Sequence, residues 1–205
     1  MNRILMAALL MAVQLSAHAG AGREAFDRFI DGLTTLQAKF EQSVLDTENA
    51  TAGLMHGVFL LQRPGKFRWD YVAPHKQIIL ADGRDVWVIE DDLKQATRHL
   101  QSWALKGTPA AFLTTDESIE KDFEVIEIGE RLDMQWLELI PRDPDSDFNR
   151  VLLAFADGEL RHMELNDKFG QISRFRFYDI ERNVSIDPEL FVFQGPSDWD
   201  ILHGN

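Results

Sequence analysis

The chain has 205 residues, of which 45% are hydrophobic and 27% are charged. This composition is sufficient for a sizeable core and excludes an intrinsically disordered or low-complexity protein. The formal net charge is −13, which argues against a nucleic-acid partner because such partners are bound through basic surfaces. Cysteine is absent, so the chain has no disulfide, thiolate nucleophile or cysteine metal site.

The first nineteen residues have the pattern of a secretory signal peptide. Arg3 precedes an apolar run from Ile4 to Leu15, and Ala17-His18-Ala19 is an A-x-A cleavage site. The run is shorter than the roughly 20 residues that a membrane span needs. We therefore expect residues 1–19 to be removed and residues 20–205 to form a single domain outside the cytoplasm.

Apolar residues at helical spacing predict one amphipathic helix near the start of the mature chain, over Arg23–Leu36. A second, short helix is expected at Ala110–Leu113, after the break at Gly107-Thr108-Pro109. Asp187 followed by Pro188 predicts one further helical turn.

The rest of the mature chain has the period-two alternation of β-strands. Asp82-Gly83 and Asp157-Gly158 separate such runs and predict hairpins. Phe191 and Phe193 suggest a last short strand. The eleven other candidates are Ala38–Leu45, Leu54–Leu61, Lys66–Val72, Gln77–Ala81, Arg84–Glu90, Lys94–His99, Phe123–Ile128, Asp133–Ile140, Arg150–Phe155, Leu160–Asn166 and Gln171–Ile180.

A series of about eleven strands with few helices between them predicts a mainly β, antiparallel fold. A twisted sheet of this length tends to curl into a barrel or half-barrel. Fourteen Phe and five Trp are available for its interior, which could hold an apolar ligand. On periodicity alone, a solid sandwich core is an equally good interpretation.

Motifs for common enzyme chemistry are absent from the sequence. The histidines are not at metal-ligand spacing, and no serine-hydrolase elbow or phosphate-binding loop is present. The many acidic residues are better explained as a solvated surface than as a glycosidase pair. We therefore expect no catalytic residue, metal or cofactor.

The segment from Leu36 to Leu100 resembles the LolA family of periplasmic lipoprotein carriers. The most specific part is Arg63-Pro64-x-x-Phe67-x-Trp69. Other matching residues are Phe40, Gln42, Gly57 to Trp69, Pro74, Asp82-Gly83, Val86-Trp87, Gln95-Ala96-Thr97, Gly107-Thr108-Pro109, Leu113, Asp187, Phe191, Phe193 and Pro196.

The resemblance implies an unclosed barrel of eleven strands with a helical lid over a hydrophobic cavity for the acyl chains of a lipoprotein. The cargo would come from an inner-membrane ABC-type release complex and pass to an outer-membrane acceptor. That acceptor shares the fold but carries a lipidated Cys, which this chain lacks. The resemblance thus implies the soluble carrier, for which a monomer is the expected state.

The resemblance also implies particular site residues. Phe112 and Leu113 are lid candidates, although Ala110-Ala111 depart from the family pattern and could shift the lid register. Arg63 matches the arginine that holds the lid closed; the alternative is that Arg63 points outward in a turn before Pro64. The expected cavity lining is Phe40, Phe59, Leu61, Phe67, Trp69 and Trp87.

Two further functions remain open at the level of sequence. A binding module of the same fold could hold another lipid or glycolipid in the cell envelope. An exported hydrolase is the least favoured interpretation, because no catalytic motif supports it.

Overall fold

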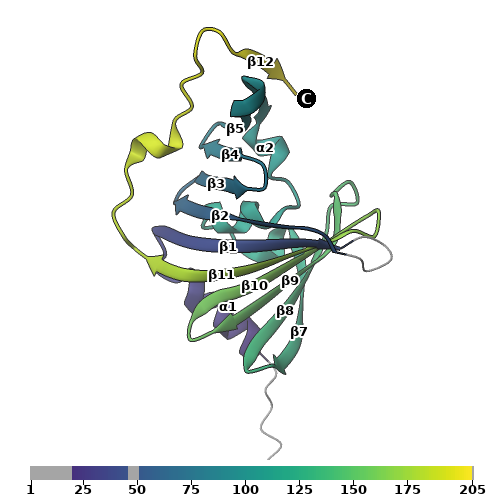
Figure 1. The fold of residues 1–205 in the computed structure, drawn as a ribbon. Helices are drawn as coiled ribbons and strands as arrows, with labels where there is room; N and C mark the ends of the chain where they lie inside the picture. The colour runs from purple at the N-terminus through teal and green to yellow at the C-terminus, as the bar shows by residue number, and fades with distance from the viewer. Residues whose placement is uncertain (1–19, 46–50, 205) are drawn as a thin grey trace, which may run out of the picture.

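The computed structural model describes residues 20–45 and 51–204; the predicted signal peptide, residues 1–19, lies outside them. Within these residues, twelve strands form one sheet in the order β12-β6-β5-β4-β3-β2-β1-β11-β10-β9-β8-β7 (Figure 1). Their bounds are β1 Thr35–Leu45, β2 Thr51–Gln62, β3 Lys66–Ala73, β4 Gln77–Asp82, β5 Asp85–Glu90, β6 Gln95–Leu100, β7 Phe123–Arg131, β8 Met134–Pro141, β9 Phe148–Ala156, β10 Glu159–Asp167, β11 Ile172–Arg182 and β12 Asp200–His203.

The sheet is an unclosed barrel with edges at β7 and β12, which confirms the predicted fold class. Neighbouring strands from β2 to β6 and from β7 to β11 follow each other in the chain and pair antiparallel, and β1 joins the two halves. The two Asp-Gly pairs lie in the hairpin turns, as predicted. Gly83 has φ +100° after β4, and Asp157 and Gly158 have φ +55° and +76° after β9. Glycine and aspartate are favoured at such positive φ angles in hairpin turns.

Three α-helices and three 3₁₀ turns accompany the sheet in the described residues: α1 Ala21–Ile30, α2 Gln101–Ala104, α3 Pro109–Thr114, η1 Asp91–Leu93, η2 Ile119–Lys121 and η3 Pro188–Phe191. The sequence did not predict α2. The turn at η3 agrees with the prediction, since the Asp187 side chain accepts a hydrogen bond from the Glu189 N–H at 3.0 Å. No helix in the described part of the chain has the length and apolar character needed to cross a membrane.

The first helix is shorter than predicted. It ends at Ile30, and Gly32 turns the chain with φ +62° before β1 begins at Thr35. Leu33 and Leu36 are buried as expected, but they reach the core from a loop and a strand. The helical spacing continued past the end of the helix because both segments bury residues in the same core.

The inner face of the sheet holds the main core, and α1 covers the half formed by β7 to β10. Phe26 and Phe29 of α1 pack on Phe155 of β9, with ring centroids 6.3 and 5.7 Å apart. The Glu127 carboxylate of β7 accepts hydrogen bonds from the N–H groups of Gly22 and Arg23 at the start of α1. This helix is therefore fixed to the sheet by both apolar contacts and a cap.

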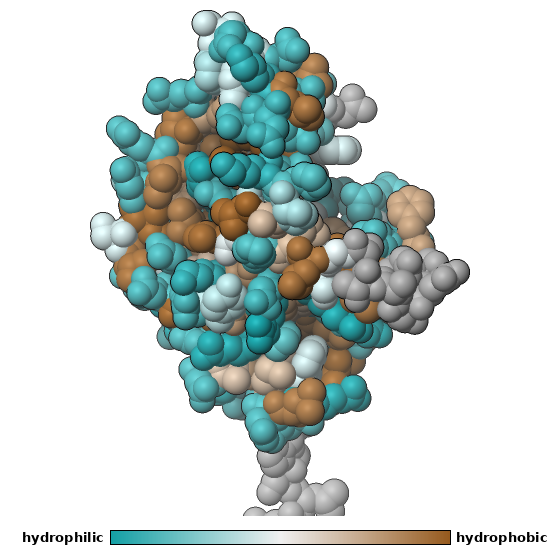
Figure 2. All heavy atoms as spheres, in the orientation of Figure 1, coloured by the Kyte–Doolittle hydropathy of each residue, from teal (hydrophilic) through white to brown (hydrophobic). Residues whose placement is uncertain are grey.

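A second, smaller core lies on the outer face, beneath the C-terminal segment. Phe191 is fully buried there and packs with Leu60 and Leu80. Figure 2 shows hydrophobic residues gathered along this segment, whereas the surface over β1 and β11 is mostly hydrophilic. The predicted strand at Phe191 and Phe193 is wrong. The side chains of both residues pack on the outer face of the sheet, and their main chain does not pair with a strand. The sequence did not predict the strand β12, which pairs parallel to β6.

Candidate functional site: an apolar cavity beneath α3

The inner face is hollow where α3, not α1, covers it. A cavity of about 180 Å³ lies between this helix and the strands. Its wall is almost entirely apolar. The residues that line this inner cavity are Phe59, Phe67, Trp69, Tyr71, Ile79, Thr108, Pro109, Ala110, Leu113, Thr114, Phe148, Met163, Leu165 and Phe175.

Strand alternation explains why the aromatic residues of β3 enter the inner cavity. Phe67, Trp69 and Tyr71 have the same parity and therefore share a face. Trp69 lies directly opposite Phe59 of β2 and Ile79 of β4. The cavity wall is thus built from cross-strand pairs, which stabilise the sheet as well as shaping the interior.

Gly57 allows the β3 backbone and the Phe40 ring to approach β2 closely. It is paired with Phe40 on one side and with Tyr71 on the other. A Cβ at this position would lie 1.8 Å from the Asp70 carbonyl oxygen and 2.9 Å from the Phe40 ring. The Phe40 and Tyr71 rings meet edge to face, with centroids 5.2 Å apart.

One buried polar pair lies beside the aromatic wall. The Tyr71 hydroxyl donates to Gln42 Oε1 at 2.8 Å. Burial raises the pKa of Tyr71 to about 12, because the charged phenolate is disfavoured away from water. Tyr71 therefore stays a neutral donor at physiological pH.

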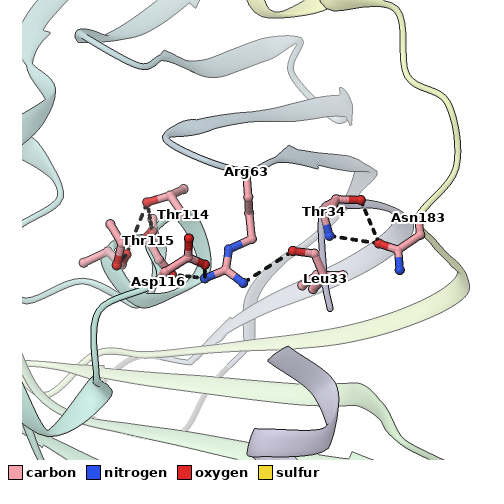
Figure 3. Close-up of polar contacts among 9 residues, drawn as sticks. Leu33, Thr34, Arg63, Thr114, Thr115, Asp116 and Asn183 are labelled. Atoms are coloured by element: carbon pink, nitrogen blue, oxygen red, sulfur yellow. Dashed lines mark hydrogen bonds and ion pairs between the residues drawn. The ribbon is translucent and has the colours of Figure 1, made fainter. Parts of the chain in front are cut away.

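Arg63 lies immediately after β2 and reaches two segments, one before β1 and one after α3 (Figure 3). Its guanidinium donates to the main-chain oxygens of Leu33, at 3.4 Å, and of Thr115, just after α3. One nitrogen lies 2.9 Å from the Asp116 carboxylate. The Arg63 side chain is only 7% exposed whereas that of Asp116 is 90% exposed, so the carbonyl contacts outweigh the ion pair.

Further contacts fix both sides of this junction. The Gly65 N–H donates to the Thr114 carbonyl and the Arg63 N–H to the Thr34 carbonyl, both at 2.8 Å. Asn183, which follows β11, accepts from the Thr34 N–H at 2.9 Å. The arginine thus lies between the end of α3 and the loop after α1, and the outward-pointing alternative does not describe its position.

The predicted site residues fall into three groups. Phe59, Phe67, Trp69 and Leu113 line the inner cavity. Phe40 and Leu61 face the same interior but are fully buried behind that wall. Phe112 lies beside it, with its ring centroid 5.6 Å from Phe26 of α1 and 6.0 Å from Phe123 of β7. In the lid, Ala110 lines the cavity and Ala111 does not.

The prediction that Trp87 lines the cavity is wrong. Trp87 packs on Phe193 in the outer core, with ring centroids 5.0 Å apart, and its indole N–H donates to Asp82 at 3.1 Å. Its neighbour Val86 enters the main core instead. Both faces of β5 are covered by apolar groups, so alternation alone did not distinguish them.

Sequence reasoning left the second half of the chain unassigned, yet it supplies four lining residues: Phe148, Met163, Leu165 and Phe175. Met163 and Phe175 are paired across β10 and β11. Gln42 was identified only as a matching residue and not as the partner of Tyr71. In the described residues, no group of three histidine or acidic side chains is arranged to hold a metal ion.

Comparison with protein families shows the family of this chain. The family model described as "Outer membrane lipoprotein carrier protein LolA" matches residues 31–194. This chain belongs to the LolA family. The match includes the inner cavity, Arg63 and the C-terminal segment as far as residue 194.

Two relatives that are named outer-membrane lipoprotein carrier protein support the assignment. The protein from Nitrosospira multiformis is 40% identical over 85% of this chain and 84% of its own length. The protein from Dechloromonas aromatica is 36% identical over 98% of this chain and 96% of its own length. An uncharacterized conserved protein from Thermus thermophilus shares the fold, with a TM-score of 0.58 at 13% identity over 90% of this chain and 99% of that one.

Proposed function

We propose that this protein is a periplasmic carrier that shelters the acyl chains of lipoproteins. The observation that carries the proposal is the apolar inner cavity beneath α3 in a member of the LolA family. Each methylene removed from water contributes about 0.8 kcal/mol, so an acyl chain does not cross an aqueous compartment unprotected. A cavity lined by aromatic and aliphatic side chains removes that barrier.

The inner cavity is too small for cargo in its present form. About 180 Å³ compares with the roughly 150 Å³ of an apolar cavity that holds one benzene molecule. An acyl chain of a lipoprotein is several times larger, so loading requires α3 to move away from the sheet. In this proposal, the arrangement seen here is the closed form of the carrier.

Arg63 is the proposed latch of this closed form. Its hydrogen bonds to Leu33 and Thr115 join the two sides of the lid. Loading breaks them and leaves a mostly buried guanidinium without its acceptors, which is unfavourable. The open, loaded state thus stores free energy that favours delivery of the cargo.

The remaining steps of the cycle follow the family. Residues 1–19 direct export and are removed, and residues 20–205 act as one domain and as a monomer. The carrier takes lipoproteins from an inner-membrane ABC-type release complex and passes them to an outer-membrane acceptor. It performs no catalysis and needs no cofactor or metal.

A release assay tests the proposal. Purified protein is incubated with spheroplasts that synthesise a labelled outer-membrane lipoprotein, and the soluble fraction is examined for label bound to the protein. Release that depends on the protein and on ATP supports the carrier function. No release, with the release complex shown to be active on another carrier, contradicts it. Mass spectrometry of co-purified lipids would then identify the cargo of a lipid-binding module.

A further inference from the structure

The donors on the wall of the inner cavity are almost all satisfied within the chain. Four lining side chains carry an N–H or O–H group. The Thr108 and Thr114 hydroxyls donate to main-chain oxygens of their own segment at 2.8 and 2.7 Å. The Tyr71 hydroxyl donates to Gln42 at 2.8 Å. The fourth donor is the indole N–H of Trp69.

Trp69 Nε1 is buried and finds no acceptor among the described residues. Two other indoles of the chain differ in this respect. Trp87 Nε1 donates to Asp82 at 3.1 Å, and Trp136 Nε1 donates to the Arg131 carbonyl at 3.0 Å. Buried polar groups without a partner are uncommon in folded proteins and destabilise them. Nine buried side-chain atoms of the described residues lack a partner, and Trp69 Nε1 is the one that belongs to a residue lining the inner cavity.

Its neighbours hold the Trp69 ring in place without offering an acceptor. Ring centroids of Phe59, Phe40 and Phe175 lie 4.7, 5.0 and 5.2 Å from that of Trp69. These rings come from β2, β1 and β11, the next three strands of the sheet after β3, so the indole has little room to turn toward a main-chain oxygen. Within the described residues no acceptor reaches this N–H, so its partner comes from outside the chain, either water or a group of the ligand.

We propose that Trp69 Nε1 donates a hydrogen bond to an acyl carbonyl oxygen of the bound cargo. The inference rests on the proposed carrier function and deepens it. A hydrocarbon chain carries no acceptor, whereas the acyl linkage places one carbonyl oxygen at the end of the chain. In an apolar cavity such a bond is stronger than in water. Trp69 is thus a specificity-determining residue that recognises acyl over alkyl chains and fixes how deeply the chain enters.

Binding of three synthetic lipopeptide probes to the purified mature protein tests the proposal. One probe carries two ester-linked palmitoyl chains, and the second carries ether-linked alkyl chains of equal length. The third is the diether with one N-palmitoyl amide. We expect the wild type to prefer the diester over the diether by about fivefold, the size of one neutral hydrogen bond.

Trp69→Phe keeps an aromatic ring and removes the donor, so its ester-to-ether ratio should fall to about one. Trp87→Phe is the matched control, since it removes an indole N–H outside the cavity and should keep the wild-type ratio. If Trp69→Phe does not fold, the assigned Trp69 indole N–H resonance of the wild type replaces it. This resonance should move downfield with the diester and not with the diether.

Each outcome has a distinct meaning. If the diester binds better than the diether and Trp69→Phe removes this preference, the acceptor is an ester carbonyl. If the amide-bearing probe binds better than the diether and Trp69→Phe reduces this gain, the acceptor is the N-acyl carbonyl. Either result supports the proposal. A diester preference that Trp69→Phe retains, or equal binding of diester and diether without an amide gain that depends on Trp69, overturns the role of Trp69 and leaves the carrier function intact. Failure of the wild type to bind any probe overturns both.

Discussion

At the scale of single residues, Phe67 tests whether the inner cavity is the binding site. Its side chain is 5% exposed and lines the cavity from β3. Phe67→Glu places a carboxyl group where acyl chains would lie, and burial of that group is unfavourable. We expect cargo affinity to fall by more than about tenfold, measured by lipopeptide binding.

The control for this substitution is Phe169→Glu. Phe169 lies in the turn between β10 and β11 and is 87% exposed, so the same chemical change should leave binding unaltered. Circular dichroism of both variants separates lost binding from unfolding. Wild-type affinity in folded Phe67→Glu would show that cargo binds elsewhere.

The buried Tyr71 phenol makes a prediction about pH. The folded protein holds its proton up to a pKa of about 12, whereas an unfolded tyrosine ionises near 10.0. Between these values the unfolded state binds fewer protons, so the free energy of unfolding falls as pH rises. At neutral pH, Tyr71→Phe should lower the free energy of unfolding by about 1 kcal/mol, because Gln42 loses its hydrogen-bond donor.

Urea unfolding of wild type and Tyr71→Phe at increasing pH measures both effects. Because the variant lacks the titrating phenol, the advantage of the wild type in free energy of unfolding should shrink as pH rises above about 10 and change sign before about 12. An advantage that stays constant over this range would mean that the phenol is not protected in the folded state.

At the scale of elements, Arg63 joins α3 to the loop after α1. Arg63→Leu removes these hydrogen bonds and so weakens the closed form without filling the cavity. We expect the variant to load cargo but to transfer it to the acceptor about tenfold more slowly, as expected when one charged hydrogen bond is lost. Transfer of labelled lipoprotein from loaded carrier to acceptor vesicles is the measurement.

Arg68→Leu is the matched control for the latch. Arg68 is also partly buried and hydrogen-bonded, to Asp70 and to the Leu190 carbonyl, but it lies on the outer face. It should transfer cargo at the wild-type rate. Normal transfer by Arg63→Leu would end the latch hypothesis.

The elements also show what sequence could and could not predict. The strands and hairpins followed from local alternation and from Asp-Gly turns, which depend on neighbouring residues alone. Trp87 points to the outer face of β5 because the C-terminal segment, more than a hundred residues later in the chain, covers that face. The end of α1 at Ile30 was missed because Leu33 and Leu36 enter the same core from a different backbone geometry.

For the candidate site, the resemblance supplied the residues of β2 and β3, and the three-dimensional structure supplied the rest. Phe148, Met163, Leu165 and Phe175 line the cavity because β9 to β11 curl beneath α3, and no local pattern separates them from ordinary core residues. The sequence likewise could not show that the Trp69 N–H lacks a partner, because this depends on where the fold places the possible acceptors.

At the scale of the whole molecule, α1 and α3 cover the inner face in different ways. The helix α1 is capped by Glu127 at its start and bonded by Arg182 through the Phe29 carbonyl near its end. The inner cavity is lined by residues of α3 and by none of α1, although β9 and β10 contribute to it. We therefore expect entering cargo to displace α3, while α1 stays in place.

Hydrogen exchange on loading tests this division. Opening exposes main-chain hydrogen bonds of the moving segment and accelerates exchange of its amides. With a diacyl lipopeptide bound, we expect amides in 101–116 to exchange about tenfold faster and those of α1 to keep their protection. The Arg63→Leu protein should show part of this acceleration without ligand, because it lacks the bonds to Leu33 and Thr115. Faster exchange in α1 with an unchanged α3 would reverse this expectation.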